Sequence, residues 1–255
     1  MADVILTGAS RGIGHALATR LAADHRLFLV SRTPPKIGGD SVAITADLSS
    51  RAEARAAGER VAQLVAPGAT LIHNAGIWPH KRVLTAEGLE AGFATNCAGP
   101  LAFQQPLLGV VERILVIGAG IMIKGRFDAD RTPTGADFSG FRTYADTKLA
   151  FAVAMRDVAA QHPDLDVLVV HPGVVRTDLG NRPGPMGWLL SLIKRSWEQP
   201  EDTAARLVRI LGRGRWSAPG NASWFVEEEK QPWPAVADDA KTREAVRAAL
   251  ARLTS

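Results

Sequence analysis

The sequence predicts an α/β protein in which one parallel sheet carries helices on both of its faces. Short runs of Val, Ile and Leu alternate with longer stretches whose apolar residues have helical spacing. The short runs show little polar alternation, which is expected of strands buried on both faces. This alternation of strands and helices favours a doubly wound parallel sheet with right-handed crossovers. Because no repeat or linker divides the 255 residues, we expect one domain over 1–255.

About seven strands are expected, each a short run of apolar residues that lacks helical spacing. They cover Val4–Leu6, Leu27–Ser31, Val42–Thr45, Thr70–His73, Ile114–Ile117, Val167–His171 and Ser223–Val226. Stretches rich in Ala, Arg, Leu and Glu lie between them and have the spacing of helices. These helices are expected at Gly14–Ala23, Arg51–Val65, Thr143–Gln161, Pro200–Leu211 and Asp239–Leu253.

Composition limits the class of protein and the kinds of partner. Hydrophobic residues make up 46% of the chain and charged residues 22%, which predicts a sizeable core and no extensive disorder. The net charge is +4, but the arginines are scattered among acidic residues, so a nucleic-acid partner is not indicated. A single cysteine, Cys97, excludes an internal disulfide and a cysteine-based zinc cluster. The strand-end histidines His73 and His171 have no acidic cluster beside them, so no metal site is expected.

The location of the protein is predicted from what the chain lacks. The N-terminus shows no basic leader followed by a long apolar run, so no signal peptide is expected. No apolar run approaches the roughly 18–20 residues that cross a bilayer, so no membrane span is expected. A lone cysteine fits a reducing compartment, and we therefore expect a cytoplasmic protein.

A glycine-rich turn joins the first strand to the first helix, in Thr7-Gly8-Ala9-Ser10-Arg11-Gly12-Ile13-Gly14. Its glycines allow a sharp turn and let backbone N–H groups approach a pyrophosphate, while the helix N-terminus adds partial positive charge. The turn follows a buried strand and opens a helix, as a dinucleotide site requires. The residues predicted to bind the cofactor here are Gly8, Ser10, Arg11, Gly12, Ile13 and Gly14.

The end of the second strand indicates which nicotinamide cofactor binds. An acidic residue there would hold the ribose 2′-hydroxyl of NAD, but the sequence reads Ser31-Arg32-Thr33-Pro34. Arg32, helped by Arg11, can hold a 2′-phosphate through paired, charge-assisted hydrogen bonds. NADP(H) is therefore favoured over NAD(H), although two solvated surface arginines are the simpler alternative.

Tyr144 and Lys148 form the most specific candidate for chemistry. Residues four apart lie on one face of a helix, so both side chains project together near the start of the predicted helix. A phenol with a pKa near 10 is a poor acid–base catalyst at neutral pH, and a nearby ammonium lowers that pKa. The pair predicts a catalytic tyrosine adjusted by a lysine, with an exposed helix pair as the alternative.

These motifs together resemble the short-chain dehydrogenase/reductase superfamily, over residues 4 to about 250. The resemblance rests on the Gly-x3-Gly-x-Gly turn, His73-Asn74-Ala75-Gly76, Tyr144-x3-Lys148 and His171-Pro172-Gly173. Lys148-Leu149-Ala150 and the tail Trp224-Phe225…Pro232-Trp233-Pro234…Asp238 are most similar to its retinol-dehydrogenase-like branch. The resemblance implies a Rossmann-type fold and transfer of the pro-S hydride of the nicotinamide to a carbonyl carbon of a hydrophobic substrate, or the reverse oxidation.

The same resemblance assigns roles to individual residues. Tyr144 would protonate the substrate oxygen, Lys148 would hold the nicotinamide ribose, and Asn96 would hold a water that links Lys148 to solvent. Further cofactor contacts are implied at Asp47, Leu48, Asn74, Ala75, Gly76, Tyr144, Lys148, Pro172, Gly173, Val175 and Thr177.

One position departs from the family pattern. Gly118 and Ala119 stand where the family has two serines, the second of which hydrogen-bonds the substrate carbonyl. Loss of one such donor typically costs about 10²–10³ in rate. Three accounts stay open: reduction by Tyr144 alone or with Thr132, Ser139, Thr143 or His80; a non-redox reaction such as dehydration, isomerisation or cyclisation; or nucleotide binding without chemistry.

The segment 178–200 is expected to cover the substrate as a loop and short helix. Its apolar residues around Trp188 suggest a hydrophobic substrate, with a dimer contact or a membrane-surface contact as alternatives. Pairing of two copies through helices near 85–109 and 143–161 would give a homodimer. The sequence does not identify the substrate or the direction of the reaction.

Overall fold

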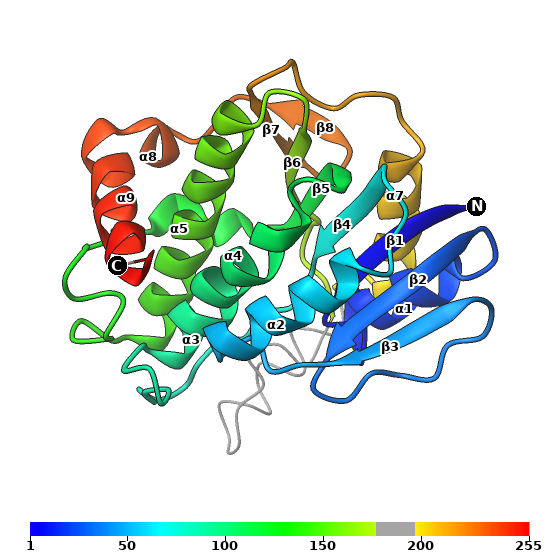
Figure 1. The fold of residues 1–255 in the computed structure, drawn as a ribbon. Helices are drawn as coiled ribbons and strands as arrows, with labels where there is room; N and C mark the ends of the chain where they lie inside the picture. The colour runs from blue at the N-terminus through cyan, green and yellow to red at the C-terminus, as the bar shows by residue number, and fades with distance from the viewer. Residues whose placement is uncertain (177–196, 255) are drawn as a thin grey trace.

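The computed structural model describes residues 1–176 and 197–254, and its strands form one sheet in the order β3-β2-β1-β4-β5-β6-β7-β8 (Figure 1). The parallel strands are β1 Ala2–Thr7, β2 His25–Ser31, β3 Ser41–Thr45, β4 Ala69–His73, β5 Val111–Ile117, β6 Asp166–His171 and β7 Ala222–Val226. The short edge strand β8 Glu229–Gln231 pairs antiparallel with β7. The predicted parallel sheet is confirmed, and β8 is an addition whose exposed polar residues gave no strand signal.

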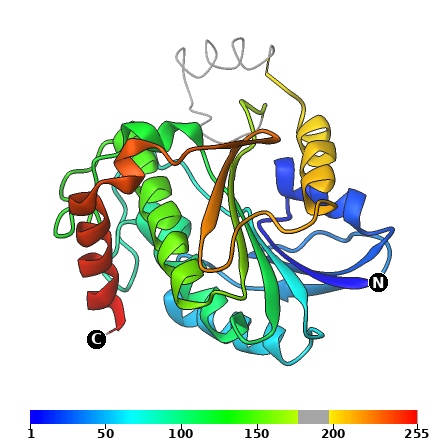
Figure 2. The ribbon, with the colours of Figure 1, turned by 90° about the horizontal axis from the view of Figure 1, so that it is seen from above.

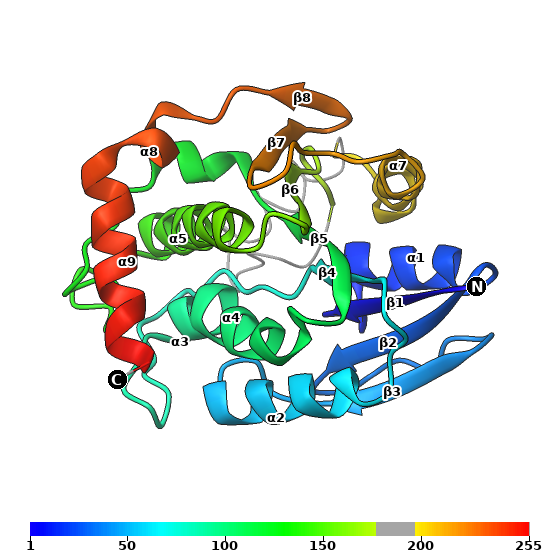
Figure 3. The same ribbon diagram turned by 45° about the horizontal axis from the view of Figure 1, so that its top comes forward.

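Helices cover both faces of this sheet (Figure 3). They are α1 Gly12–Leu21, α2 Arg51–Ala62, α3 Ala91–Phe93, α4 Gly99–Gln104, α5 Gly140–Gln161, α7 Pro200–Leu211, α8 Ala235–Asp238 and α9 Ala240–Thr254. A π-helical turn at Ala94–Ala98 joins α3 to α4, and 3-10 turns lie at Gln105–Leu107 and Gly120–Lys124. Within the described residues, no helix combines the length and the apolar character needed to cross a membrane.

Two hydrophobic cores explain why the strands read as unbroken apolar runs. Successive residues of a strand point to opposite faces. In β6, Val167 and Val169 enter the core shared with α2, α4 and α5, whereas Leu168 and Val170 enter the core beneath α1 and α7. The view from above shows the sheet between these two helical layers (Figure 2).

The C-terminal helices pack on the outer side of α5. Asp157 of α5 forms ion pairs with Arg243 and Arg247 of α9, and Arg156 pairs with Asp238 of α8. The predicted pairing of two copies would use this same helix. The homodimer therefore stays a prediction, and α8 and α9 occupy part of the surface that it would use.

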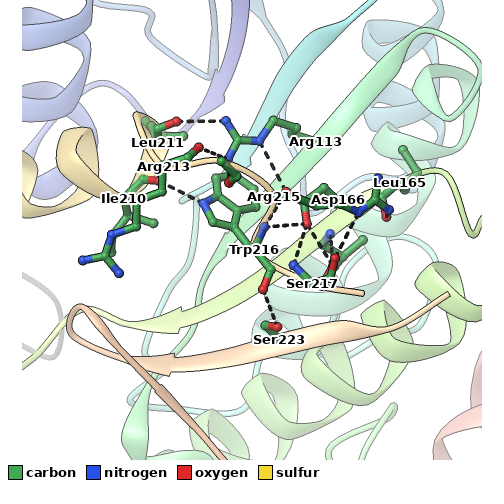
Figure 4. Close-up of polar contacts among 12 residues, drawn as sticks. Arg113, Leu165, Asp166, Ile210, Leu211, Arg213, Arg215, Trp216, Ser217 and Ser223 are labelled. Atoms are coloured by element: carbon green, nitrogen blue, oxygen red, sulfur yellow. Dashed lines mark hydrogen bonds and ion pairs between the residues drawn. The ribbon is translucent and has the colours of Figure 1, made fainter. Parts of the chain in front are cut away.

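A polar network fastens the amino ends of β5, β6 and β7 (Figure 4). The buried carboxylate of Asp166 accepts hydrogen bonds from the Trp216 and Ser217 backbone N–H groups and from the Ser217 hydroxyl, each at 2.9 Å. The guanidinium of Arg113 lies 3.6 Å from Asp166 and 3.6 Å from the Trp216 ring centroid. Because Arg113 is partly buried, its pKa is lowered, although the nearby carboxylate opposes this effect.

Candidate active site

A cleft of about 540 Å³ opens at the carboxyl ends of the parallel strands. Doubly wound sheets bind ligands at this edge, in the crevice where the strand order reverses, here between β1 and β4. Most of the predicted cofactor residues line the cleft: Gly8, Ser10, Arg11, Gly12, Ile13, Arg32, Asp47, Leu48, Asn74, Ala75, Gly76, Tyr144, Lys148, Pro172, Gly173 and Val175. Chain segments that are far apart in the sequence therefore meet at one site.

The glycine turn is shaped by close backbone packing. Gly8 has φ +71°, and a Cβ there would lie 2.7 Å from the Ala75 Cα. A Cβ on Gly14 would lie 2.3 Å from the Gly8 carbonyl oxygen, so this glycine lets α1 pack against the turn and does not line the cleft. No side chain caps the N-terminus of α1, which leaves its first N–H groups available for a phosphate.

Thr7 and Asn74 hold the turn against the loop that follows β4. The Asn74 Nδ2 donates to the carbonyl oxygens of Thr7 and Gly8, at 3.1 and 3.0 Å. The Thr7 hydroxyl accepts hydrogen bonds from the backbone N–H groups of Asn74 and Ala75, both at 3.1 Å. Asn74 thus holds the glycine turn in place, a structural role in addition to its predicted contact with the cofactor.

Two arginines line the part of the cleft next to the end of β2. Arg11 and Arg32 are both exposed, and neither guanidinium has a hydrogen-bond or ion-pair partner among the described residues. Asp47 follows β3 on the same side, and its Oδ1 accepts from the Ser49 N–H at 2.9 Å. The donor set at this end fits an anionic group such as a ribose 2′-phosphate.

Tyr144 and Lys148 enter the cleft together from the first turns of α5. The Lys148 Nζ donates to the carbonyl oxygen of Ile117 at 3.0 Å and lies 5.9 Å from the Tyr144 ring centroid. Burial lowers the pKa of Lys148 to about 8. A Cβ on Gly76 would lie 3.4 Å from the Lys148 Nζ, so glycine at this position leaves room for the ammonium.

The tyrosine environment differs from the sequence expectation. Burial raises the pKa of the Tyr144 phenol above its ordinary value, and Lys148 is not among the groups that lower it. Its ring also stacks on Trp78, with 4.8 Å between ring centroids and 8° between ring planes. Tyr144 is therefore a neutral phenol at neutral pH, which suits it to donate a proton.

Asn96 lies behind the cleft, in the π-helical turn Ala94–Ala98. Its Oδ1 accepts from the Ile77 N–H at 2.8 Å, and its Nδ2 donates to the Ile77 carbonyl oxygen at 2.9 Å and to the Thr147 hydroxyl at 3.0 Å. Thr147 in turn donates to the Tyr144 carbonyl oxygen at 3.0 Å. The asparagine side chain thus fixes the Asn-Ala-Gly loop against the helix that carries Tyr144.

The two serine positions differ in how much space they have. Gly118 and Ala119 both line the cleft. A Cβ on Gly118 would lie 3.0 Å from Val169 Cγ1 and 3.3 Å from the Trp224 ring, so a side chain at this position would meet packed neighbours. The missing hydroxyl therefore concerns Ala119, at the 3-10 turn that follows β5.

The predicted substitutes for that hydroxyl lie elsewhere. Thr132 is buried and donates to Asp137 at 3.1 Å, while the Thr143 hydroxyl accepts from the Ser139 N–H at 3.2 Å. Ser139 and His80 are exposed, and none of these four residues lines the cleft. Thr177 and residues 178–196 of the predicted substrate segment lie outside the described residues. Across 1–176 and 197–254, no cluster of His, Cys, Asp and Glu could hold a metal ion.

Sequence reasoning missed three residues at this site. Trp78 covers the Tyr144 ring, Thr147 links Asn96 to α5, and His171 lines the cleft at the end of β6. Trp78 follows the Asn-Ala-Gly loop, which was the signal that could have placed it near the nicotinamide end. The positions of Thr147 and His171 follow from the packing of α5 and β6, and no motif marks them.

Comparison with known proteins extends these findings. The family profile described as short chain dehydrogenase matches residues 2–123. Mouse polyprenol dehydrogenase is 27% identical, with 89% of this chain and 76% of that protein covered. Human retinol dehydrogenase 14 is 27% identical, with 69% and 62% covered. An uncharacterized oxidoreductase from Emericella nidulans is 30% identical, with 72% and 74% covered. Bovine dehydrogenase/reductase SDR family member 12 is 34% identical, but the match spans 36% of its length.

Solved structures show the same fold. An uncharacterized protein from Mycobacterium paratuberculosis matches with a TM-score of 0.76 and 22% identity, covering 100% of this chain and 93% of that one. NADPH-bound carbonyl reductase from chicken fatty liver matches with a TM-score of 0.67 and 19% identity, covering 91% and 99%. The chain therefore belongs to the short-chain dehydrogenase/reductase family of oxidoreductases, in its retinol-dehydrogenase-like branch.

Proposed function

We propose that this protein is an NADP(H)-dependent oxidoreductase that reduces a carbonyl group of a hydrophobic small molecule, or oxidises the corresponding alcohol. One observation carries this proposal: Tyr144 and Lys148 enter the same cleft as the glycine turn and two arginines that have no partner among residues 1–176 and 197–254. If Tyr144 and Lys148 were only two residues on an ordinary helix, there would be no reason for their side chains to enter the cleft that the glycine turn lines.

The chain supplies the proton and the binding groups of this reaction. Bound NADPH would supply a hydride to the carbonyl carbon. Tyr144, a neutral phenol in its buried position, would donate its proton to the carbonyl oxygen. Lys148, held by the Ile117 carbonyl oxygen, would contact the nicotinamide ribose with its remaining N–H donors. Asn96 would act as a positioning residue, because its bonds fix the loop that faces Lys148.

The cofactor preference follows from charge at the end of β2. Arg32 and Arg11 offer two guanidinium groups that are not consumed by other contacts within the described part of the chain. A 2′-phosphate would accept paired hydrogen bonds from them, whereas the 2′-hydroxyl of NAD would leave both charges uncompensated. The chicken carbonyl reductase of the same fold is NADPH-bound, which supports this preference by analogy.

The substrate class is inferred from the apolar wall beside Tyr144. Trp78 stacks on the tyrosine, and Phe141 approaches Trp78 with 6.3 Å between ring centroids. Phe141 is 52% exposed, so its ring is accessible to an apolar ligand. Two relatives are named for isoprenoid alcohols, polyprenol and retinol, which supports a hydrophobic carbonyl or alcohol as the substrate.

The cytoplasmic location of the protein remains a prediction.

Cofactor binding is the first test of this proposal. Purified protein would be titrated with NADPH and with NADH, following nicotinamide fluorescence, for the wild type, R32A and the control R20A. Arg20 is an exposed arginine of α1 that does not line the cleft. We expect R32A to weaken NADPH binding by about 10–100-fold and to leave NADH binding nearly unchanged, because one charge-assisted hydrogen bond contributes about 1.5–3 kcal/mol. Equal affinity of the wild type for both nucleotides would refute the NADP(H) preference.

Turnover is the second test. Consumption of NADPH with a panel of hydrophobic aldehydes and ketones would support reduction, and Y144F should abolish it. Unchanged turnover in Y144F would contradict the role of the phenol.

A second function is favoured by the alanine at position 119. Without the serine hydroxyl, the cleft is less suited to polarise a carbonyl, and a dehydration, isomerisation or cyclisation on the same scaffold, or binding alone, becomes the alternative. Conversion of a substrate with no net change in the oxidation state of the nicotinamide would support the non-redox alternative. Nucleotide binding with no conversion of any substrate would support binding alone.

A further inference from the structure

The cleft of this chain has a gap in its polar groups at the place where a carbonyl would be reduced. Ile117, Gly118 and Ala119 form the wall at the end of β5, and none of their side chains can donate a hydrogen bond. The polar residues that line the cleft include Tyr144, Lys148 and His171. Tyr144 and Lys148 already have roles in the proposed function, and His171 has none.

His171 is placed by the alternation of β6. Val167 and Val169 point into the core beneath α5, so His171, two residues further on, points to the same face as Tyr144 and Lys148. Its ring lies against Gly120: a Cβ on that glycine would be 2.9 Å from both Nε2 and Cδ2 of the imidazole. Glycine next to Ala119 thus makes room for the ring beside the vacated serine position.

The ring nitrogens have no partners. Neither nitrogen takes part in a hydrogen bond with the described residues, and Nδ1 is enclosed without a partner. A buried N–H without an acceptor is rarer in proteins than a buried acceptor without a donor, so the proton belongs on Nε2. Nε2 is the nitrogen beside Gly120, next to the cleft wall. Burial lowers the pKa of His171, so the ring is neutral at neutral pH and keeps one N–H donor.

We propose that the Nε2–H of His171 donates a hydrogen bond to the substrate carbonyl oxygen, in place of the serine hydroxyl that Ala119 lacks. This inference rests on the proposed reductase function. A neutral imidazole can polarise a carbonyl in this way. His171 transfers no proton in this step; Tyr144 gives its proton to the same oxygen as the hydride reaches the carbon, so His171 stabilises charge and Tyr144 balances it.

The test compares the wild type with H171L, H171Q, A119S and the double variant A119S/H171L. Leucine fills a similar space without a donor, and glutamine keeps a side-chain N–H. Each variant would be assayed for NADPH affinity, and for kcat with whichever hydrophobic carbonyl of the panel the wild type reduces. Circular dichroism and thermal unfolding would report whether each variant folds.

The expected result is a loss of about 10²–10³ in kcat for H171L, with NADPH affinity within about twofold of the wild type. H171Q should lose less, and A119S should restore at least about tenfold of the activity that H171L loses. Such rescue by a hydroxyl on the neighbouring residue 119 would not occur if His171 only supported the backbone. If H171L fails to fold, H171M and A119S/H171M, whose methionine also lacks a donor, carry the same comparison.

Three outcomes would overturn the inference. Wild-type kcat in H171L would show that the imidazole does not touch the reacting oxygen. A loss of NADPH affinity as large as the loss of kcat would show that His171 serves to bind the cofactor. If A119S fails to restore activity to H171L, His171 has only a structural role. A wild type that binds NADPH but reduces no carbonyl would refute the proposed function as well. This failure can be told apart from failure of the His171 inference, because it is seen with the wild type before any variant is assayed.

Discussion

Replacement of Lys148 by methionine is expected to stabilise the protein at neutral pH relative to alkaline pH. Lys148 is 7% exposed, its Nζ donates a hydrogen bond to the Ile117 carbonyl oxygen, and burial lowers its pKa from 10.5 to about 8. Methionine has nearly the same length and no charge. The variant therefore removes a buried ammonium and keeps most of the packing.

The magnitude follows from linkage between folding and protonation. Between pH 8 and pH 10.5 the unfolded chain keeps the lysine proton that the folded chain has lost, so the stability of the wild type rises with pH over this window. Each tenfold change in an equilibrium constant corresponds to about 1.4 kcal/mol, so the full difference is about 3 kcal/mol. Below pH 8 both states are protonated and the wild type bears the whole cost of the buried charge.

Other groups near Lys148 do not imitate this effect. Burial lowers the pKa of His73 to about 4, so its ring is neutral throughout the window. Burial raises the pKa of Tyr144, so its phenol stays neutral in the folded protein. Both residues are also present in the variant, and their contributions cancel in the comparison.

The assay is urea unfolding of the wild type and K148M at pH 7 and pH 10.5, with K36M as the control at an exposed lysine. The free energy of unfolding of K148M minus that of the wild type should fall by about 3 kcal/mol from pH 7 to pH 10.5. By linkage this change depends only on the folded and unfolded pKa values of Lys148, so any part of the lost Ile117 bond that does not vary with pH cancels. An equal difference at both pH values, as expected for K36M, would refute the claim that Lys148 is charged and costly when buried.

Three further predictions concern stability away from the reacting groups. D166A should lower the free energy of unfolding by about 3–5 kcal/mol, because it leaves three buried donors and a partly buried guanidinium without the Asp166 carboxylate. D164A is the control at an exposed aspartate, and an equal loss of stability in both variants would contradict this role of Asp166. G118S should lower the free energy of unfolding by about 1–3 kcal/mol, because the new side chain meets Val169 and Trp224. A urea midpoint equal to that of the wild type would show that these neighbours move to make room for it. E227G should be more stable than E227A by about 1 kcal/mol in the same assay, since residue 227 has φ 56°; equal stabilities would show that this backbone carries no strain.

The fold was predictable because its signals are local. Strands such as Val167–His171 are apolar on both faces, since both faces of the sheet carry helices, and this pattern is visible in any short window. The antiparallel strand β8 was missed because its residues are exposed and polar, so it forms by pairing with β7 at the sheet edge. The π-helical turn that carries Asn96 also has no local signature.

The candidate site was predictable only in part. The glycine turn, the Asn-Ala-Gly loop and the Tyr144–Lys148 pair were found because each is a short motif with a physical requirement of its own. The environment of Tyr144 was not found: Trp78 stacks on it from 66 positions away in the chain, and burial raises its pKa where the lysine was expected to lower it. Neither a stacking partner nor a degree of burial can be read from neighbouring residues.

The sequence by itself determined the alternation of strands and helices, the dinucleotide turn, the loss of a hydroxyl at position 119 and the positive charge at Arg32, because each depends on residues that are adjacent or one helical turn apart. Only the tertiary structure showed that a side chain at position 118 would meet Val169 and Trp224. It also placed the imidazole of His171 beside Gly120 and packed α8 and α9 against α5. These features depend on contacts between segments far apart in the chain, which are fixed when the two cores close around the sheet.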